Sequence, residues 1–168
     1  MASGPLIVTA TFGPDDHAWL EGLRRRHYPA EKNRVPVHLT LLRQLAPSLD
    51  AELRDRLAAA ASLPPPHAWM TGVMDLGEGT ALRVASEELE AIRAELADAF
   101  DLMLTPQDQA PWQPHVTVQN KVPRRDAITL QKLLQVEVFP RPLAIRGLAS
   151  WRYLDGPWEP VRAYPFRG

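Results

Sequence analysis

The chain has 168 residues, 45% of them hydrophobic, so we expect one domain over residues 1–168, with two lobes sharing a core. A formal net charge of −1 disfavours a long nucleic-acid footprint or an anionic membrane surface, although a local cationic pocket for a phosphate stays possible. The lack of cysteine excludes disulfides, thiolate catalysis and cysteine-bound zinc.

The apolar run Leu6–Phe12 is the first segment with a recognisable pattern. It has no basic residue before it and is far shorter than the roughly 20 residues of a membrane span, so it predicts a strand and neither a secretory signal nor a transmembrane helix. We therefore expect a cytoplasmic protein with no membrane association. The sequence does not reveal the oligomeric state, and a monomer without an obligate protein partner is the default expectation.

The first half of the chain then alternates helical and extended patterns. Pro14 is expected to open a helix, which ends in a basic run at 24–26 interpreted as a solvent-exposed helix end. A strand is predicted over 37–43. Ser48 is a candidate N-cap for the next helix, because Leu49, Leu53 and Leu57 form an apolar stripe behind it.

The second half repeats this order of elements. Predicted in turn are a hairpin of strands 68–76 and 80–84, a helix capped by Ser86, a loop over 101–113, a strand over 115–122, a helix over 124–135, and strands over 143–154 and 158–164. Each half thus runs helix, strand, helix, strand, strand. The repeat suggests an internal duplication, and the interleaving predicts an α+β fold with antiparallel or mixed sheets.

Two short segments carry the chemistry: His38-Leu39-Thr40-Leu41 and His115-Val116-Thr117-Val118. Both have the pattern His, aliphatic, Thr, aliphatic. Residues two apart in a strand point to the same face, so each strand should present an imidazole beside a hydroxyl. Background composition predicts such a triplet after a given His at roughly the 1% level, so two matches among five His need an explanation.

With these paired motifs the chain resembles the two-histidine phosphoesterase superfamily, and within it the bacterial 2′-5′ RNA ligase-like group of RNA 2′,3′-cyclic phosphodiesterases. The resemblance implies two similar lobes flanking a central groove, with the helices outside. It also implies that His38 and His115 are catalytic and that Thr40 and Thr117 donate hydrogen bonds to phosphate oxygens.

The implied reaction suits these side chains. Ring opening of a cyclic phosphodiester needs a base to activate water and an acid to protonate the leaving ribose oxygen, and imidazole serves for both near neutral pH. No metal or other cofactor is then required. The expected substrates are RNA 3′ ends or small nucleotides with 2′,3′-cyclic or 2′-5′ phosphodiesters, opened to 2′-phosphates. Reverse 2′-5′ ligation is possible by microscopic reversibility, and which His is the base is left open.

Four further residues are candidates for substrate binding. Gln119 and Lys121 share the predicted face of His115, and Lys121 could neutralise a phosphate. Arg34 has the parity of His38 and could do the same, while Trp112 could stack on a base.

Two alternatives remain beside the enzyme. A nucleotide-binding module could use the same groove without turnover, although binding alone does not need a paired acid and base. A structural protein would need the double motif to be a coincidence.

Overall fold

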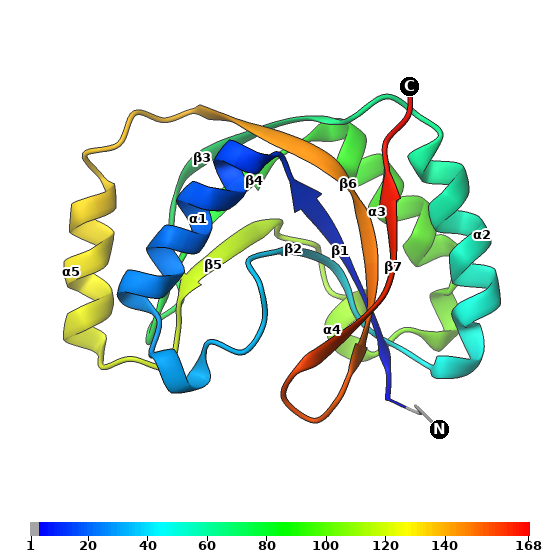
Figure 1. Ribbon diagram of the computed structural model, residues 1–168, viewed down its shortest axis with the longest axis horizontal. Helices are drawn as coiled ribbons and strands as arrows, with labels where there is room; N and C mark the ends of the chain where they lie inside the picture. Colours follow the sequence, from blue (N-terminus) through cyan, green and yellow to red (C-terminus); the bar gives the residue numbers. More distant parts are fainter. Residues whose placement is uncertain (1–3) are drawn as a thin grey trace.

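In the computed structural model, which describes residues 4–168, strands and helices alternate along the chain (Figure 1). The strands are β1 (Leu6–Phe12), β2 (Leu39–Leu45), β3 (His67–Asp75), β4 (Thr80–Ala85), β5 (His115–Gln119), β6 (Arg141–Tyr153) and β7 (Trp158–Pro165). The helices are α1 (Pro14–His27), α2 (Asp50–Ala61), α3 (Glu87–Ala99), α4 (Pro106–Gln109) and α5 (Arg124–Leu134). Short 3₁₀ turns occur at Ala30–Lys32, Pro47–Leu49 and Asp101–Met103.

All strands belong to one antiparallel sheet, in the order β1-β2-β5-β4-β3-β6-β7. Because β1 also pairs with β6, the sheet closes on itself like a barrel, and β7 is added to β6 outside the ring. The helices lie outside the sheet, with α1 and α5 at one end and α2 and α3 at the other in Figure 1. This confirms the predicted α+β fold. Over residues 4–168, no helix has both the length and the apolar composition required to cross a bilayer.

Helix starts follow the local signals in two cases. Helix α1 begins at Pro14, with Asp15 and Asp16 in its first turn, where the positive end of the helix dipole favours carboxylates. Helix α3 is capped by Ser86, whose hydroxyl accepts a hydrogen bond from the Leu89 N–H at 3.2 Å. Both starts were predicted from the sequence.

Two local predictions are wrong. Ser48 is not an N-cap, because it lies inside the 3₁₀ turn Pro47–Leu49 and α2 starts only at Asp50. The predicted loop 101–113 contains the short helix α4, whose N-cap Thr105 accepts a hydrogen bond from the Asp108 N–H. Four residues are too few to show helical periodicity, so a turn of this kind leaves no pattern in the sequence.

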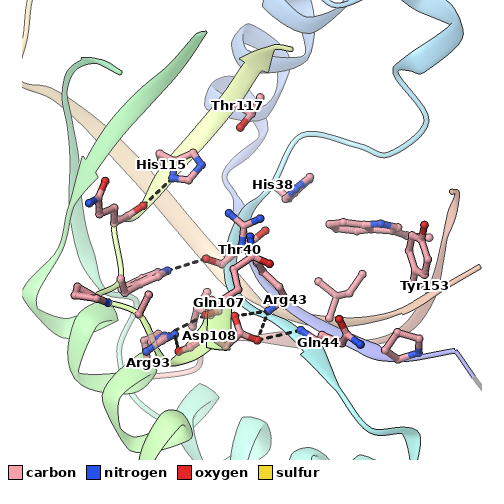
Figure 2. Close-up of a pocket in the computed structure, with 18 residues that line it drawn as sticks. His38, Thr40, Arg43, Gln44, Arg93, Gln107, Asp108, His115, Thr117 and Tyr153 are labelled. Atoms are coloured by element: carbon pink, nitrogen blue, oxygen red, sulfur yellow. Dashed lines mark hydrogen bonds between the residues drawn. The ribbon is translucent and has the colours of Figure 1, made fainter. Parts of the chain in front are cut away.

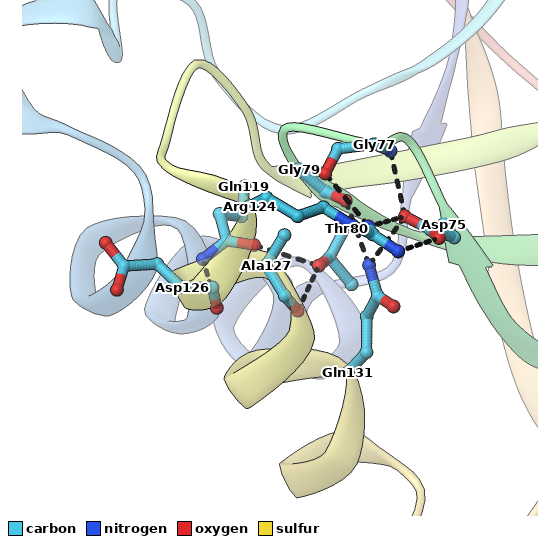
Figure 3. Close-up of polar contacts among 9 residues, drawn as sticks. All are labelled: Asp75, Gly77, Gly79, Thr80, Gln119, Arg124, Asp126, Ala127 and Gln131. Atoms are coloured by element: carbon cyan, nitrogen blue, oxygen red, sulfur yellow. Dashed lines mark hydrogen bonds and ion pairs between the residues drawn. The ribbon is translucent and has the colours of Figure 1, made fainter.

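The predicted hairpin of β3 and β4 forms and is fastened to α5 by charged and polar groups (Figure 3). The Asp75 carboxylate accepts hydrogen bonds from Arg124 at 2.6 and 2.8 Å, from Gln131 at 2.9 Å and from the Gly77 N–H at 2.8 Å. These donors, with Arg124 as the largest contributor, hold the pKa of Asp75 well below its usual range. These bonds hold the β3–β4 hairpin in place, and β4 pairs with β5 along its other edge.

Candidate active site

The two motif strands are neighbours in the sheet. Strands β2 and β5 pair at Leu39 and Val116, the aliphatic residue that follows each motif histidine. In an antiparallel pair, this register sets His38 opposite Thr117 and Thr40 opposite His115. Each imidazole therefore lies beside the hydroxyl of the other motif, and the two motifs form one site rather than two.

Both histidines are held in the same way. The Nδ1 atom of His38 lies 2.7 Å from the Pro36 carbonyl oxygen, and the Nδ1 atom of His115 lies 2.7 Å from the Gln113 carbonyl oxygen. A carbonyl can only accept, so each Nδ1 carries the proton. In the neutral ring Nε2 then bears a free lone pair, and both imidazoles are prepared to act through Nε2.

His38, Thr40, His115 and Thr117 line a single cavity of about 670 Å³ (Figure 2). The structure thus brings the four motif side chains together, and none of them is fully buried. The remaining wall comes from several other elements. It includes Ile7 of β1, Arg43 and Gln44 of β2, Arg93 of α3, Asp108 of α4, Trp112 of the loop before β5, Tyr153 of β6 and Trp158 of β7.

A bulge in β2 brings Arg43 to the cavity. Successive residues Val8 and Thr9 of β1 pair with Leu42 and Thr40, so Leu41 is an extra residue in β2. Beyond it the strand alternation is reversed, and Arg43 faces the same side as Thr40. Simple alternation places Arg43 on the opposite face from His38, which is why sequence reasoning did not identify it.

A second bulge, in β5, removes Gln119 from the predicted face. Ala81 and Thr80 of β4 pair with Thr117 and Gln119, so Val118 is the extra residue and Gln119 points away from Thr117. Gln119 is 3% exposed, and its side chain accepts a hydrogen bond from the Thr80 hydroxyl at 2.8 Å (Figure 3). Contrary to the prediction, it does not line the cavity. Both bulges fall on the fourth residue of the motif.

Lys121 and Arg34 are also outside the cavity lining. Strand β5 ends at Gln119, and Lys121 has φ = 60° in the turn that follows, so the strand alternation no longer applies to it. Arg34 lies in the irregular segment before β2, where its Nε donates to the Glu31 carbonyl at 3.3 Å. Trp112 does line the cavity, and its indole N–H donates to the Thr40 carbonyl at 3.0 Å.

The environment of Arg24 differs most from the one expected from the sequence. It was expected at a solvent-exposed helix end, but it is 2% exposed. Its guanidinium donates to the Thr117 carbonyl at 2.9 Å and to the Asn33 side-chain oxygen at 3.0 and 3.1 Å. Burial lowers the pKa of this group from its usual value. Arg24 thus fixes the second motif strand against the loop that leads to the first.

The segment around α4 is fastened to β2 by three side chains. Asp108 is 3% exposed, and its carboxylate accepts the backbone N–H groups of Arg43, at 2.9 and 3.0 Å, and of Gln44, at 3.1 Å. Arg93 donates to the carbonyls of Leu41 at 3.1 Å and Asp108 at 2.6 Å. With the Trp112 bond to Thr40, these contacts hold the loop before His115 against the bulged part of β2.

Trp158 covers His38. The ring centroids lie 4.5 Å apart at an interplanar angle of 46°. Burial lowers the pKa of His38 to about 4; its hydrogen bond to Pro36 opposes the shift, and the charges of Arg24, His115 and Arg43 add to it. His38 is therefore neutral near pH 7. Trp158 follows His38 by 120 residues in the sequence, and no local pattern links the two.

Removing the Trp158 ring should raise the pKa of His38 towards the usual value of about 6.5, because water then reaches the imidazole. An NMR titration of the histidine ring protons of Trp158→Ala measures this directly. Trp158→Phe keeps an aromatic cover and should stay close to wild type, as should Trp69→Ala, which removes a partly exposed tryptophan on β3. An unchanged His38 titration in Trp158→Ala would contradict the role of this ring.

The same variant supplies a second readout. Folded His38 binds a proton less readily than the unfolded chain does, so acidification from about pH 6.5 towards 4 lowers the free energy of unfolding of the wild type. Trp158→Ala should flatten this pH dependence.

Over residues 4–168, no three His, Asp or Glu side chains form a group that could hold a metal ion.

Comparisons with known proteins identify relatives of this sequence and of this fold. A sequence model of the 2′-5′ RNA ligase superfamily matches residues 12–157. Among solved structures, TT0787 of Thermus thermophilus is 19% identical with a TM-score of 0.64, and the alignment covers 98% of both chains. E. coli LigT complexed with 3′-AMP is 17% identical with a TM-score of 0.59, and LigT complexed with NADP⁺ is 16% identical with a TM-score of 0.59; these alignments cover 99% and 100% of both chains. No curated protein matches the sequence significantly.

Proposed function

This chain belongs to the 2′-5′ RNA ligase superfamily, and we propose that it is a phosphodiesterase that opens 2′,3′-cyclic phosphates of RNA ends or nucleotides. The observation that carries the proposal is the pair of imidazoles, each bonded through Nδ1 to a carbonyl and each lining the same cavity. An acid and a base on opposite sides of one phosphorus are what an in-line displacement requires. We propose that this enzyme does not use a metal ion.

The proposed reaction balances with these two side chains alone. One Nε2 accepts a proton from water as the water oxygen bonds to phosphorus. The P–O3′ bond breaks on the opposite side, and the other imidazole, which enters the step protonated on both ring nitrogens, gives its Nε2 proton to O3′. The product carries a 2′-phosphate. Thr40 and Thr117 donate hydrogen bonds to the non-bridging oxygens, where negative charge increases in the transition state.

The burial of His38 supports a division of roles. A pKa of about 4 leaves its Nε2 unprotonated near pH 7, as a general base requires. His115 then supplies the proton to the leaving oxygen. In the reverse direction the roles exchange, so the same pair would serve 2′-5′ ligation. Trp112, in the cavity wall, is the proposed stacking contact for the nucleobase of the substrate.

A nucleotide-binding module is the second candidate. E. coli LigT is described in complex with 3′-AMP and with NADP⁺, and a nucleotide ligand suits the aromatic and polar wall of this cavity equally well. Binding without turnover gives no reason for two imidazoles with free Nε2 atoms in one cavity. We therefore favour the enzyme.

Incubation of the purified protein with an RNA oligonucleotide that ends in a 2′,3′-cyclic phosphate should yield the 2′-phosphate, at the same rate with and without EDTA. Mass spectrometry gives the added water, and separation from a 3′-phosphate standard gives the position of the phosphate. The reason for EDTA resistance is that both proton transfers are assigned to imidazoles.

If the protein binds the substrate without hydrolysing it, its function is that of a nucleotide-binding module. Loss of turnover on chelation, restored by Mg²⁺ or Mn²⁺, would defeat the two-imidazole mechanism.

A further inference from the structure

The cavity holds a cation to which the proposed reaction gives no role. Arg43 is exposed and lines the same cavity as the motif histidines, and within residues 4–168 its guanidinium makes no hydrogen bond or ion pair. Arg93, the other arginine of the lining, is committed to the carbonyls of Leu41 and Asp108. Arg43 is therefore the lining arginine that is available to an anionic ligand.

The Arg43 side chain is directed towards the two imidazoles. Figure 2 shows it extending from β2 towards Thr40, His38 and His115. Burial is the largest cause of the low pKa of His38, and the charge of Arg43 is one of those that add to it. The guanidinium charge therefore acts at the place where the two imidazoles would flank a phosphate.

Two features of β2 fix this direction. The bulge at Leu41 turns Arg43 to the same face as Thr40. The buried Asp108 carboxylate then accepts the backbone N–H groups of Arg43 and Gln44. Because the backbone is held, only the side chain of Arg43 has to be ordered when a ligand binds, and this reduces the entropic cost of the contact.

The proposed reaction increases the negative charge between the imidazoles. A cyclic phosphodiester carries one negative charge, whereas a phosphate monoester such as the 2′-phosphate product carries about −1.5 to −2 near pH 7. The hydroxyls of Thr40 and Thr117 are neutral donors. Guanidinium is a permanent cation whose planar donors bind two phosphate oxygens at once, so it is suited to stabilise this added charge.

We propose that Arg43 is a further catalytic residue, which binds the non-bridging oxygens of the reacting phosphate and stabilises their negative charge in the transition state. This inference rests on the proposed function. It adds no proton transfer to the reaction, because the guanidinium stays protonated throughout and the two imidazoles remain the base and the acid. Strand β2 would then supply an imidazole, a hydroxyl and a guanidinium to one phosphate.

Substitution of Arg43 tests this role with adenosine 2′,3′-cyclic phosphate as the substrate. Arg43→Gln should lower kcat by about 10²- to 10³-fold, the usual effect of removing one donor to an oxyanion, and should change KM much less. Arg43→Lys keeps the charge without the planar donors and should be intermediate. Arg54→Gln removes an exposed arginine of α2 outside the cavity lining and should match the wild type. A near-normal kcat in Arg43→Gln, or a loss confined to KM, would overturn the assignment.

The pH dependence separates contact with the phosphate from an effect carried by His38. Removing the Arg43 charge also raises the pKa of His38, while the other charges that face this imidazole, those of Arg24 and His115, stay in place. A variant impaired only in this way should regain the wild-type rate at about pH 8, above the ordinary imidazole pKa of about 6.5. Direct contact predicts that the loss persists at this pH, and recovery there would overturn the proposed contact.

Binding distinguishes a failure of this inference from a failure of the proposed function. Calorimetry of adenosine 2′-monophosphate requires no turnover. Arg43→Gln should weaken its affinity about ten- to a hundredfold, as expected for a hydrogen bond between charged groups, and should leave the affinity of adenosine unchanged. If no cyclic substrate is hydrolysed, the proposed function fails, but a weakened affinity for the monophosphate still supports Arg43 as a phosphate ligand. Equal monophosphate affinities in the wild type and Arg43→Gln would refute the contact, with or without turnover.

Discussion

Replacing either His38 or His115 with alanine should lower kcat/KM for a 2′,3′-cyclic phosphate by about 10²- to 10⁴-fold, the usual contribution of one acid or base. Each substitution removes one of the two proton transfers. The double variant should have a kcat/KM only slightly below that of the more damaging single variant, because the remaining acid or base contributes little to the rate once its partner is absent. Steady-state rates of all three variants measure this.

Asparagine variants show which atom acts. His38→Asn and His115→Asn place an amide where Nδ1 stood, so they can keep the hydrogen bonds to the carbonyls of Pro36 and Gln113. They have no group at the position of Nε2, and we expect them to be as inactive as the alanine variants. His67→Ala, an exposed histidine on β3 that bonds Glu88, is the matched control and should retain full activity. Near-normal turnover in any of the four motif variants would remove that histidine from the mechanism.

Replacing Asp108 with alanine should lower the free energy of unfolding by about 3 to 5 kcal/mol. The carboxylate is buried and accepts hydrogen bonds from the N–H groups of Arg43 and Gln44. Hydrogen bonds to a charged group are worth about 1.5–3 kcal/mol each, and the two amides would be left without an acceptor. Urea denaturation measures the loss. Asp55→Ala, an exposed aspartate in the middle of α2, should change stability by less than about 1 kcal/mol.

Asp108→Asn separates charge from shape. The amide keeps one acceptor oxygen but turns an NH₂ group towards one backbone donor, so its cost should lie between those of wild type and alanine. A stability loss under about 1 kcal/mol for Asp108→Ala would show that water replaces the carboxylate and that the bulge needs no such anchor.

Features that depend on residues close together in the chain could be predicted from the sequence. The two motifs, the helix start at Pro14, the Ser86 cap and the β3–β4 hairpin each depend on residues a few positions apart. The alternation of side chains along a strand was enough to place each histidine beside a threonine. The α+β class followed from the order of such local signals, and the structure confirms it.

Which other residues reach the site depends on pairing between segments that are distant in the sequence. The bulges at Leu41 and Val118 depend on pairing with β1 and β4, and each reverses the alternation on which parity arguments rest, so Arg43 enters the cavity and Gln119 leaves it. Trp158 covers His38 across 120 residues of sequence.

Charged residues show the same limit. Arg24 was interpreted as part of a solvent-exposed helix end because charge usually prefers water, and Asp108 lay in a segment predicted only as a loop. Backbone groups from distant segments make their burial possible: Thr117 accepts from Arg24, and Arg43 and Gln44 donate to Asp108. Such partners come together only when the sheet closes, so no pattern along the chain could reveal them.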